Sequence, residues 1–214
     1  MKHNEQGRSM IEMLGVLAII GVLSVGGLAG YAKAMGKYKL NKTVDQITQI
    51  VAGTRNLFAG HGDYKALGIE KECKTNENNG NLIIKGNLLP EAMISKRKAE
   101  DFQTENAYGG NVYLSCGDKR NSGDGKAFVI ILENVSVDAC MELATQNWGG
   151  KNSSGFVGLC VAPKGSQNTE LGDVTLSSAG NNCFQEQVSL ATATTACGGE
   201  DGKATHASMK WKFY

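Results

Sequence analysis

Residues 13–32, MLGVLAIIGVLSVGGLAGYA, form an uncharged apolar run that decides how the rest of the chain is organised. A helix of this length spans roughly 30 Å, which is the thickness of the hydrocarbon core of a bilayer. A secretory signal peptide has a shorter apolar core that is followed by a small-residue cleavage site, and this run has neither property. We therefore predict a single membrane-spanning helix here.

A carboxylate stands at the start of this apolar run. The polar segment Met1–Gly7 (MKHNEQG) is followed by Arg8, and Glu12 is the last charged residue before Lys33. Burying such a charge costs about 2.5 to 3.5 kcal/mol at the centre of a membrane helix, and less near an interface. Glu12 is therefore either an interfacial side chain that reaches water or a group that pairs with a positive charge.

The polar leader, Gly7, Glu12 in the fifth position after that glycine, and the apolar run together resemble the class III signal of type IV pilins and pseudopilins. The resemblance implies cleavage between Gly7 and Arg8 and N-methylation of the new N-terminus. It also implies that Glu12 guides assembly by meeting the N-terminal amine of a neighbouring subunit. Arg8 departs from the family, which usually has an apolar residue at that position.

The same resemblance implies a structural fibre subunit with no cofactor. Its partners would be other copies of itself in a helical fibre, a prepilin peptidase, assembly platform and motor proteins, and minor pilins. The precursor would cross the inner membrane once, with its C-terminal head outside the cytoplasm, before it joins an extracellular pilus. The lysines after the apolar run favour the opposite orientation, but long C-terminal domains translocate largely regardless of charge. These lysines are Lys33, Lys37, Lys39 and Lys42, against Lys2 and Arg8 before the run.

Two features suggest that the predicted helix does more than anchor the chain in a membrane. Gly26 and Gly30 have the GxxxG spacing that permits close helix approach in membranes, although isolated glycines are also common there. After the apolar run, apolar residues recur at helical spacing and predict an amphipathic continuation to about residue 59. We expect a leader at 1–7, a helix at 8–60 and a head at 61–214. The amphipathic stripe comprises Leu40, Val44, Ile47, Val51, Thr54 and Phe58.

The sequence predicts an α+β fold, in which the long helix packs on an antiparallel β-sheet of the head. Strand-like runs occupy 111–116, 126–132, 155–162 and 206–213. A short helix is expected at 136–146, with Ser136 as its N-cap, and another begins near Pro90.

Six cysteines lie in the head, and none of them are close enough to form a CxxC pair. An even number at wide spacing favours disulfides in an oxidising compartment, although the residues alone leave fifteen pairings open. The strand, turn and helix over 127–141 resemble type IVb pilins, which implies a Cys140–Cys197 bond. Nesting then suggests Cys160–Cys183 and Cys73–Cys116. The short leader departs from type IVb pilins, which usually have long ones.

No residues indicate catalysis or metal binding. The three histidines, His3, His61 and His206, fall in no catalytic motif, and a net charge of +1 gives no sign of nucleic-acid binding. Three functions stay open: a major fibre subunit, a minor pilin or type II secretion pseudopilin, and an anchored periplasmic binding protein that is never cleaved. The role of a fibre, in adhesion, motility, DNA uptake or secretion, is also open.

Overall fold

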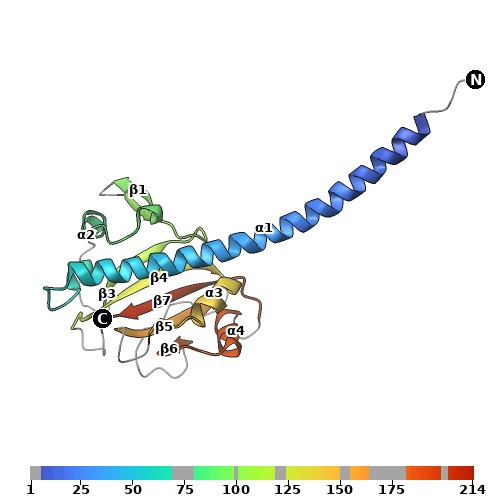
Figure 1. Cartoon of the computed structure of the whole chain (residues 1–214). Coiled ribbons are helices and arrows are strands. Elements are labelled where there is room, and N and C mark those ends of the chain that lie inside the picture. The colour runs from blue at the N-terminus through green and yellow to red at the C-terminus, as the bar shows by residue number, and fades with distance from the viewer. Residues whose placement is uncertain are drawn as a thin grey trace, which may run out of the picture. The chain divides into compact units, whose positions relative to one another are not determined.

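The computed structural model describes residues 6–68, 80–98, 101–118, 124–149, 155–163, 182–198 and 202–214. The chain divides into two compact units, Met1–Lys39 and Leu40–Tyr214. Helix α1 (Gln6–Leu57) begins in the first unit and ends in the second, shortly before Gly60 and Gly62 (Figure 1). The predicted long N-terminal helix is therefore confirmed, with an end two residues earlier than expected.

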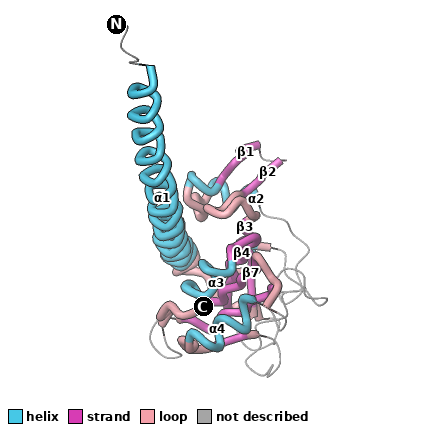
Figure 2. Tube along the Cα trace, turned by 90° about the vertical axis from the view of Figure 1, so that its right-hand side faces the viewer, coloured by secondary structure: helices cyan, strands magenta, loops and turns pink. Residues whose placement is uncertain are grey.

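An antiparallel sheet of five strands forms the centre of the second unit (Figures 1 and 2). The strand order is β3-β4-β7-β5-β6, so the C-terminal strand of the chain lies in the middle. The sheet therefore cannot be completed until the last residues of the chain are in place. The strands are β3 (Val112–Gly117), β4 (Ala127–Ser136), β5 (Phe156–Pro163), β6 (Cys183–Phe184) and β7 (His206–Phe213).

Shorter elements surround this sheet. A separate antiparallel pair joins β1 (Ile94–Lys98) to β2 (Asp101–Thr104). The remaining helices are α2 (Gly80–Lys85), α3 (Val137–Ala144) and α4 (Leu190–Gly198), together with the 3-10 turns η1 (Lys65–Leu67) and η3 (Glu91–Met93). The turn η3 corresponds to the helix expected near Pro90, whereas β1, β2, α2 and α4 were not predicted.

The C-terminal half of α1 buries one face in the hydrophobic core of the head. Leu40, Ile47 and Phe58 of the predicted stripe are buried, but Val44 and Val51 are only partly so. The buried face is therefore rotated from the predicted stripe and includes residues outside it. Those additional buried residues are Thr43, Gln46 and Ile50.

Four aromatic rings join the end of α1 to the sheet. Phe58 lies 5.2 Å from Tyr64, Tyr64 lies 5.0 Å from Phe128, and Phe128 stacks on Phe213 at 5.8 Å, measured between ring centroids. Burial raises the pKa of the Tyr64 hydroxyl, and the positive charge of Arg55 partly opposes that rise. The rings therefore keep the end of α1 against strands β4 and β7.

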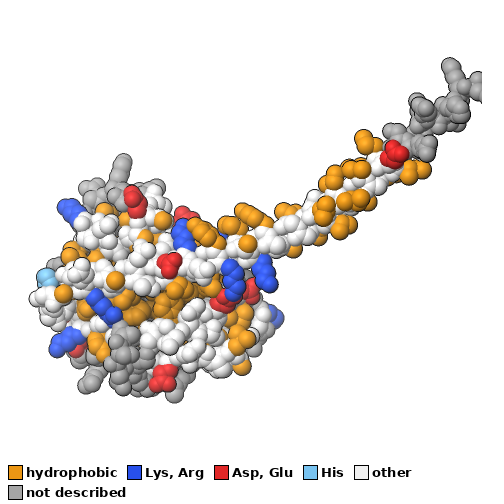
Figure 3. Space-filling model, viewed as in Figure 1, with side chains coloured by type: hydrophobic (Ala, Val, Ile, Leu, Met, Phe, Trp, Pro, Cys, Tyr) orange, Lys and Arg blue, Asp and Glu red, His pale blue; other side chains and the backbone are white. Residues whose placement is uncertain are grey.

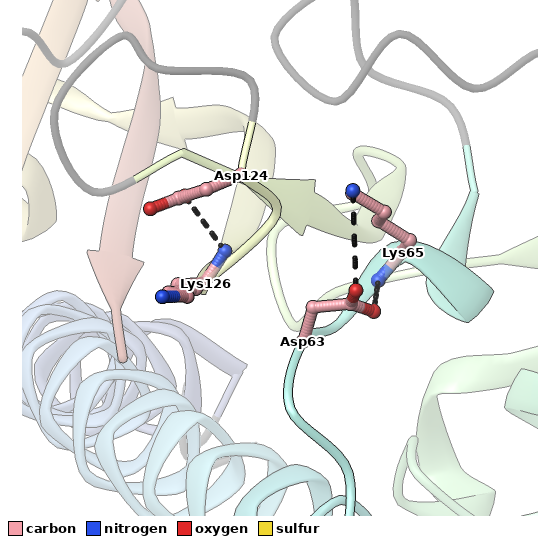
Figure 4. A network of polar contacts seen from close by, with 4 residues as sticks. All are labelled: Asp63, Lys65, Asp124 and Lys126. Atoms are coloured by element: carbon pink, nitrogen blue, oxygen red, sulfur yellow. Dashed lines mark hydrogen bonds and ion pairs between the residues drawn. The ribbon is translucent and has the colours of Figure 1, made fainter.

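Two aspartates fix the turns beside this aromatic group (Figure 4). Asp63 accepts a hydrogen bond from the backbone N–H of Lys65, and Asp124 accepts one from that of Lys126. Hydrogen bonds from an aspartate side chain to the backbone two residues later stabilise turns. The exposed Lys65–Asp63 ion pair, with 3.9 Å between its charged atoms, contributes little to stability. We conclude that this network is structural.

Strand β4 differs from its prediction. It runs to Ser136 instead of ending near residue 132, because a bulge between Leu132 and Val135 lets pairing with β7 resume. Asn134 adopts a positive φ of 59° at this bulge. Ser136 precedes α3 as expected, but its side chain makes no capping hydrogen bond, and α3 ends at Ala144.

Candidate assembly and processing site

Gly7 and Arg8, the predicted cleavage positions, lie at the beginning of α1. Their backbone is helical, one and two residues after the first residue of the helix. Nothing else in the described structure bears on cleavage, so the cut between them stays a prediction.

Glu12 lies one turn further along and is exposed. It has no hydrogen-bond or ion-pair partner in the part of the chain that the structure describes. Its neighbours Ile11 and Met13 are apolar and are 74% and 66% exposed. A single carboxylate among apolar side chains has unmet pairing capacity once water is removed, so a positive partner from outside the chain would satisfy it.

The side chains of the apolar run are not buried by the rest of the described structure. From Met10 to Tyr31 the large apolar side chains are between 53% and 75% exposed, and Figure 3 shows apolar side chains along the visible face of this part of the helix. By length and composition this stretch can cross a membrane, and none of its most apolar window is buried. A helix that is apolar all round is stable only when lipid or other apolar helices cover it.

The glycines of the run have open space around them. A Cβ built at Gly26 or Gly30 would meet nothing within 4 Å, and the same holds at Gly15, Gly21 and Gly27. Packing inside the chain therefore gives no reason for glycine at these positions, each of which costs helix stability of up to about 1 kcal/mol relative to alanine. Close approach by another helix would give such a reason, as the GxxxG spacing predicts.

Two disulfides connect elements of the head. Cys140 of α3 bonds to Cys197 of α4 across 57 residues, with an S–S distance of 2.02 Å. Cys160 of β5 bonds to Cys183 of β6 across 23 residues. Cys116 is also disulfide-bonded, while its predicted partner, Cys73, lies outside the described residues.

Helix α4, which carries Cys197, was not predicted from the sequence. Its sequence LATATTACG contains no charged residue and many threonines, which are poor helix formers. The signal that could have found it is Ser189, whose hydroxyl accepts a hydrogen bond from the backbone N–H of Thr192 at 3.2 Å. That is the geometry of an N-cap.

The histidines are not gathered into a site. His61 packs its ring against Phe58, and His206 contacts Thr205, its neighbour in sequence. His3 lies outside the described residues. In the part of the chain that the structure describes, no three His, Cys, Asp or Glu side chains are placed to hold a metal ion.

Comparison with known proteins gave a family and several distant relatives. A family model described as "PilS N terminal" matches residues 37–208. The major structural subunit of the bundle-forming pilus of Escherichia coli O127:H6 (strain E2348/69 / EPEC) is 22% identical over 204 residues, covering 94% of this chain and 91% of that protein. The toxin coregulated pilin of Vibrio cholerae is 22% identical over 144 residues, covering 67% of this chain and 58% of that protein.

Two solved structures also align with the chain. The crystal structure of type IV b pilin from Salmonella typhi has a TM-score of 0.47 and 17% identity, and it covers 78% of this chain and 96% of that chain. The NMR structure of type IVb pilin (PilS) from Salmonella typhi has a TM-score of 0.42 at the same identity, with coverage of 81% and 95%.

Proposed function

Because this chain belongs to the PilS N-terminal family of type IV pilins, we propose that it is a structural subunit of a type IV pilus and polymerises through the first part of α1. It is not an enzyme, since the family is structural. The chain first exists as a membrane-anchored precursor with its head outside the cytoplasm. It then joins an extracellular fibre built from copies of itself.

The observation that carries the proposal is the apolar surface between Met10 and Tyr31, where every large apolar side chain is more than half exposed. The family match covers residues 37–208 and therefore does not include this stretch. In the proposed function, this apolar surface is buried in a different environment at each of two stages. Lipid covers it in the precursor, and the same stretch of other subunits covers it in the fibre.

Cleavage between Gly7 and Arg8 creates the group that Glu12 requires. The new N-terminal amine of one subunit meets the Glu12 carboxylate of a neighbour in the apolar centre of the fibre. The pair sets the axial position of each incoming subunit, because leaving either charge unpaired there is costly. The guanidinium of Arg8 supplies further hydrogen-bond donors to the same carboxylate. A prepilin peptidase makes the cut, and assembly platform and motor proteins move the subunit.

The first experiment determines where the mature chain begins. Intact-mass measurement and N-terminal sequencing of the protein from membranes and from sheared fibres should both give Arg8. A mature chain that begins at Met1 would contradict the processing step and would favour an anchored periplasmic protein. High abundance in sheared fibres is expected of a major subunit, whereas trace amounts would indicate a minor pilin.

The second experiment replaces Glu12 by alanine. The variant should still be cleaved, but the mass of sheared fibres should fall by about tenfold or more, because the incoming amine has no partner. The matched control is Glu105→Ala, which removes an exposed carboxylate from the head. Normal fibres from the Glu12 variant would show that this carboxylate does not set the axial position.

A further inference from the structure

We propose that the head binds a neutral saccharide on the outer face of its sheet, where β3 and β4 lie side by side. The site consists of Asn111, Tyr113, Ile131 and Glu133, here called the outer quartet. The proposal goes beyond the proposed function, because it adds a ligand to the head and needs no assembly through α1.

The outer quartet lies on the face of the sheet that is turned away from α1. Val112 is buried in the core that also contains the second half of α1. Successive side chains of a strand point to opposite faces, so Asn111 and Tyr113 on either side of it point away from that core. Tyr113 lies opposite Ile131 in the register of the two strands. The backbone N–H of Glu133 donates to the carbonyl of Asn111, which completes the patch.

The polar side chains of the outer quartet are connected through one amide nitrogen. Nδ2 of Asn111 donates to Oε2 of Glu133 at 3.0 Å and to the hydroxyl oxygen of Tyr113 at 3.2 Å. Because the amide supplies both hydrogens, the Tyr113 hydroxyl keeps its own hydrogen for a further bond. Oδ1 of Asn111 and Oε1 of Glu133 remain as acceptors. Asn111 is exposed and Tyr113 is 46% exposed, so these groups can be reached from solvent.

The backbone beneath the outer quartet is fixed by a neighbouring loop. Nδ2 of Asn106 donates to the carbonyl oxygen of Glu133 at 2.7 Å. Gly110 lies so close to the same carbonyl that a Cβ there would clash with it. The side chain of Asn134, the residue with a positive φ in the β4 bulge, donates to the carbonyl of Tyr108. The carboxylate is therefore positioned before a ligand arrives, which lowers the entropy cost of binding.

A pyranose sugar matches these groups. Its C–H face is apolar and can pack on the ring of Tyr113, while its hydroxyls both donate and accept hydrogen bonds. Neighbouring hydroxyls donate to the free oxygens of Asn111 and Glu133, and a sugar oxygen accepts from the Tyr113 hydroxyl. A peptide has no comparable row of hydroxyls. In the proposed fibre α1 runs along the centre, so a sheet face turned away from α1 faces the surroundings.

The test is saturation-transfer difference NMR on the full-length protein in dodecylphosphocholine, a detergent without a sugar headgroup. The probes are the methyl pyranosides of glucose, galactose and mannose, each added separately. At least one should receive saturation, most strongly on the C–H protons of one ring face. Tyr113→Ala should reduce this signal by about tenfold or more, and Asn111→Ala/Glu133→Ala by about tenfold.

Two further variants separate binding from folding. Tyr113→Phe keeps the ring and loses only the hydroxyl, so its signal should fall by about threefold, with stacking on one ring face retained. The matched control is Leu190→Ala, which removes an apolar side chain of the head that is 65% exposed. That variant should bind as the wild type does.

Three results would overturn the inference. The first is that none of the three pyranosides receives saturation from the wild type, and the second is an unchanged signal in Tyr113→Ala. The third is that the tripeptide Gly-Lys-Gly binds through Glu133 while no pyranoside does. None of these results concerns fibre formation, so the proposed function would stand. A mature chain that begins at Met1 would refute assembly instead, and sugar binding in detergent would be unaffected.

Discussion

Residues 10–38 and residues 40–57 belong to the same helix but have opposite relations to their surroundings. In the first segment, the large apolar side chains from Met10 to Tyr31 are more than half exposed, and Met35 near its end is partly buried. In the second, one face is buried completely at Thr43, Ile47, Ile50 and Thr54. The head covers the second segment with its own sheet and aromatic residues, so that segment needs no further partner.

This difference separates folding from assembly. Burial of one face of residues 40–57 contributes to the free energy of unfolding of the head. The exposed stretch does not pack on the head, so its apolar surface stays available for lipid or for other subunits. Changes in the second segment should therefore act on stability. Changes in the first should act on membrane anchoring and fibre formation.

The strongest test of this separation places the same charge in both segments. Ile47→Asp would leave an unpaired carboxylate in the core, where the cost exceeds about 4 kcal/mol, and the head should unfold. Ile20→Asp should leave head stability unchanged, because Ile20 is 53% exposed. Fluorescence of Trp148 and Trp211, both in the head, reports unfolding of the full-length protein in detergent. Equal destabilisation by the two variants would abolish the distinction.

Removing a disulfide should also act on the head alone. Cys140→Ala/Cys197→Ala opens a loop of 57 residues and should lower the free energy of unfolding by about 4 kcal/mol. Cys160→Ala/Cys183→Ala opens a loop of 23 residues and should cost about 3 kcal/mol. Urea titrations followed by tryptophan fluorescence measure both values. An equal or reversed order would show that native packing outweighs loop entropy here.

The smallest expected effect is a gain in stability. The Thr54 hydroxyl is buried and has no hydrogen-bond partner in the described structure. Thr54→Val keeps the shape and removes the unpaired oxygen, so the free energy of unfolding should rise by about 1 kcal/mol. The control is Thr48→Val, since Thr48 is exposed and bonds to the carbonyl of Val44. A loss of stability in Thr54→Val would point to a partner for the hydroxyl.

The long helix and the main strands could be predicted because their signals are local. Strand β7 agrees with the prediction at both ends, and β3 and β5 are each shifted from it by one residue at both ends. The extension of β4 could not be foreseen, since it depends on renewed pairing with residues of β7 that are at least 70 positions away in sequence. The strands β1 and β2 are short, and their existence depends on pairing with each other.

Burial on the sheet was harder to predict than strand position. The alternation of HASMKWKF suggests that Lys210 and Lys212 face water, yet both are at most 2% exposed. Asp118, which directly follows β3, is a charged residue that is only 1% exposed. A pattern of alternation identifies two faces of a strand, but it does not tell whether one of them is covered.

The uncharged apolar stretch, the single carboxylate at its edge and the lysines at its other end are evident from the amino-acid sequence alone. These are properties of neighbouring residues, so no fold is needed to see them. Three features required the folded head: which face of residues 40–57 is buried, which elements the disulfides connect, and the position of β7 between β4 and β5. Those features depend on contacts between residues far apart in the chain, and such contacts exist only after the head has folded.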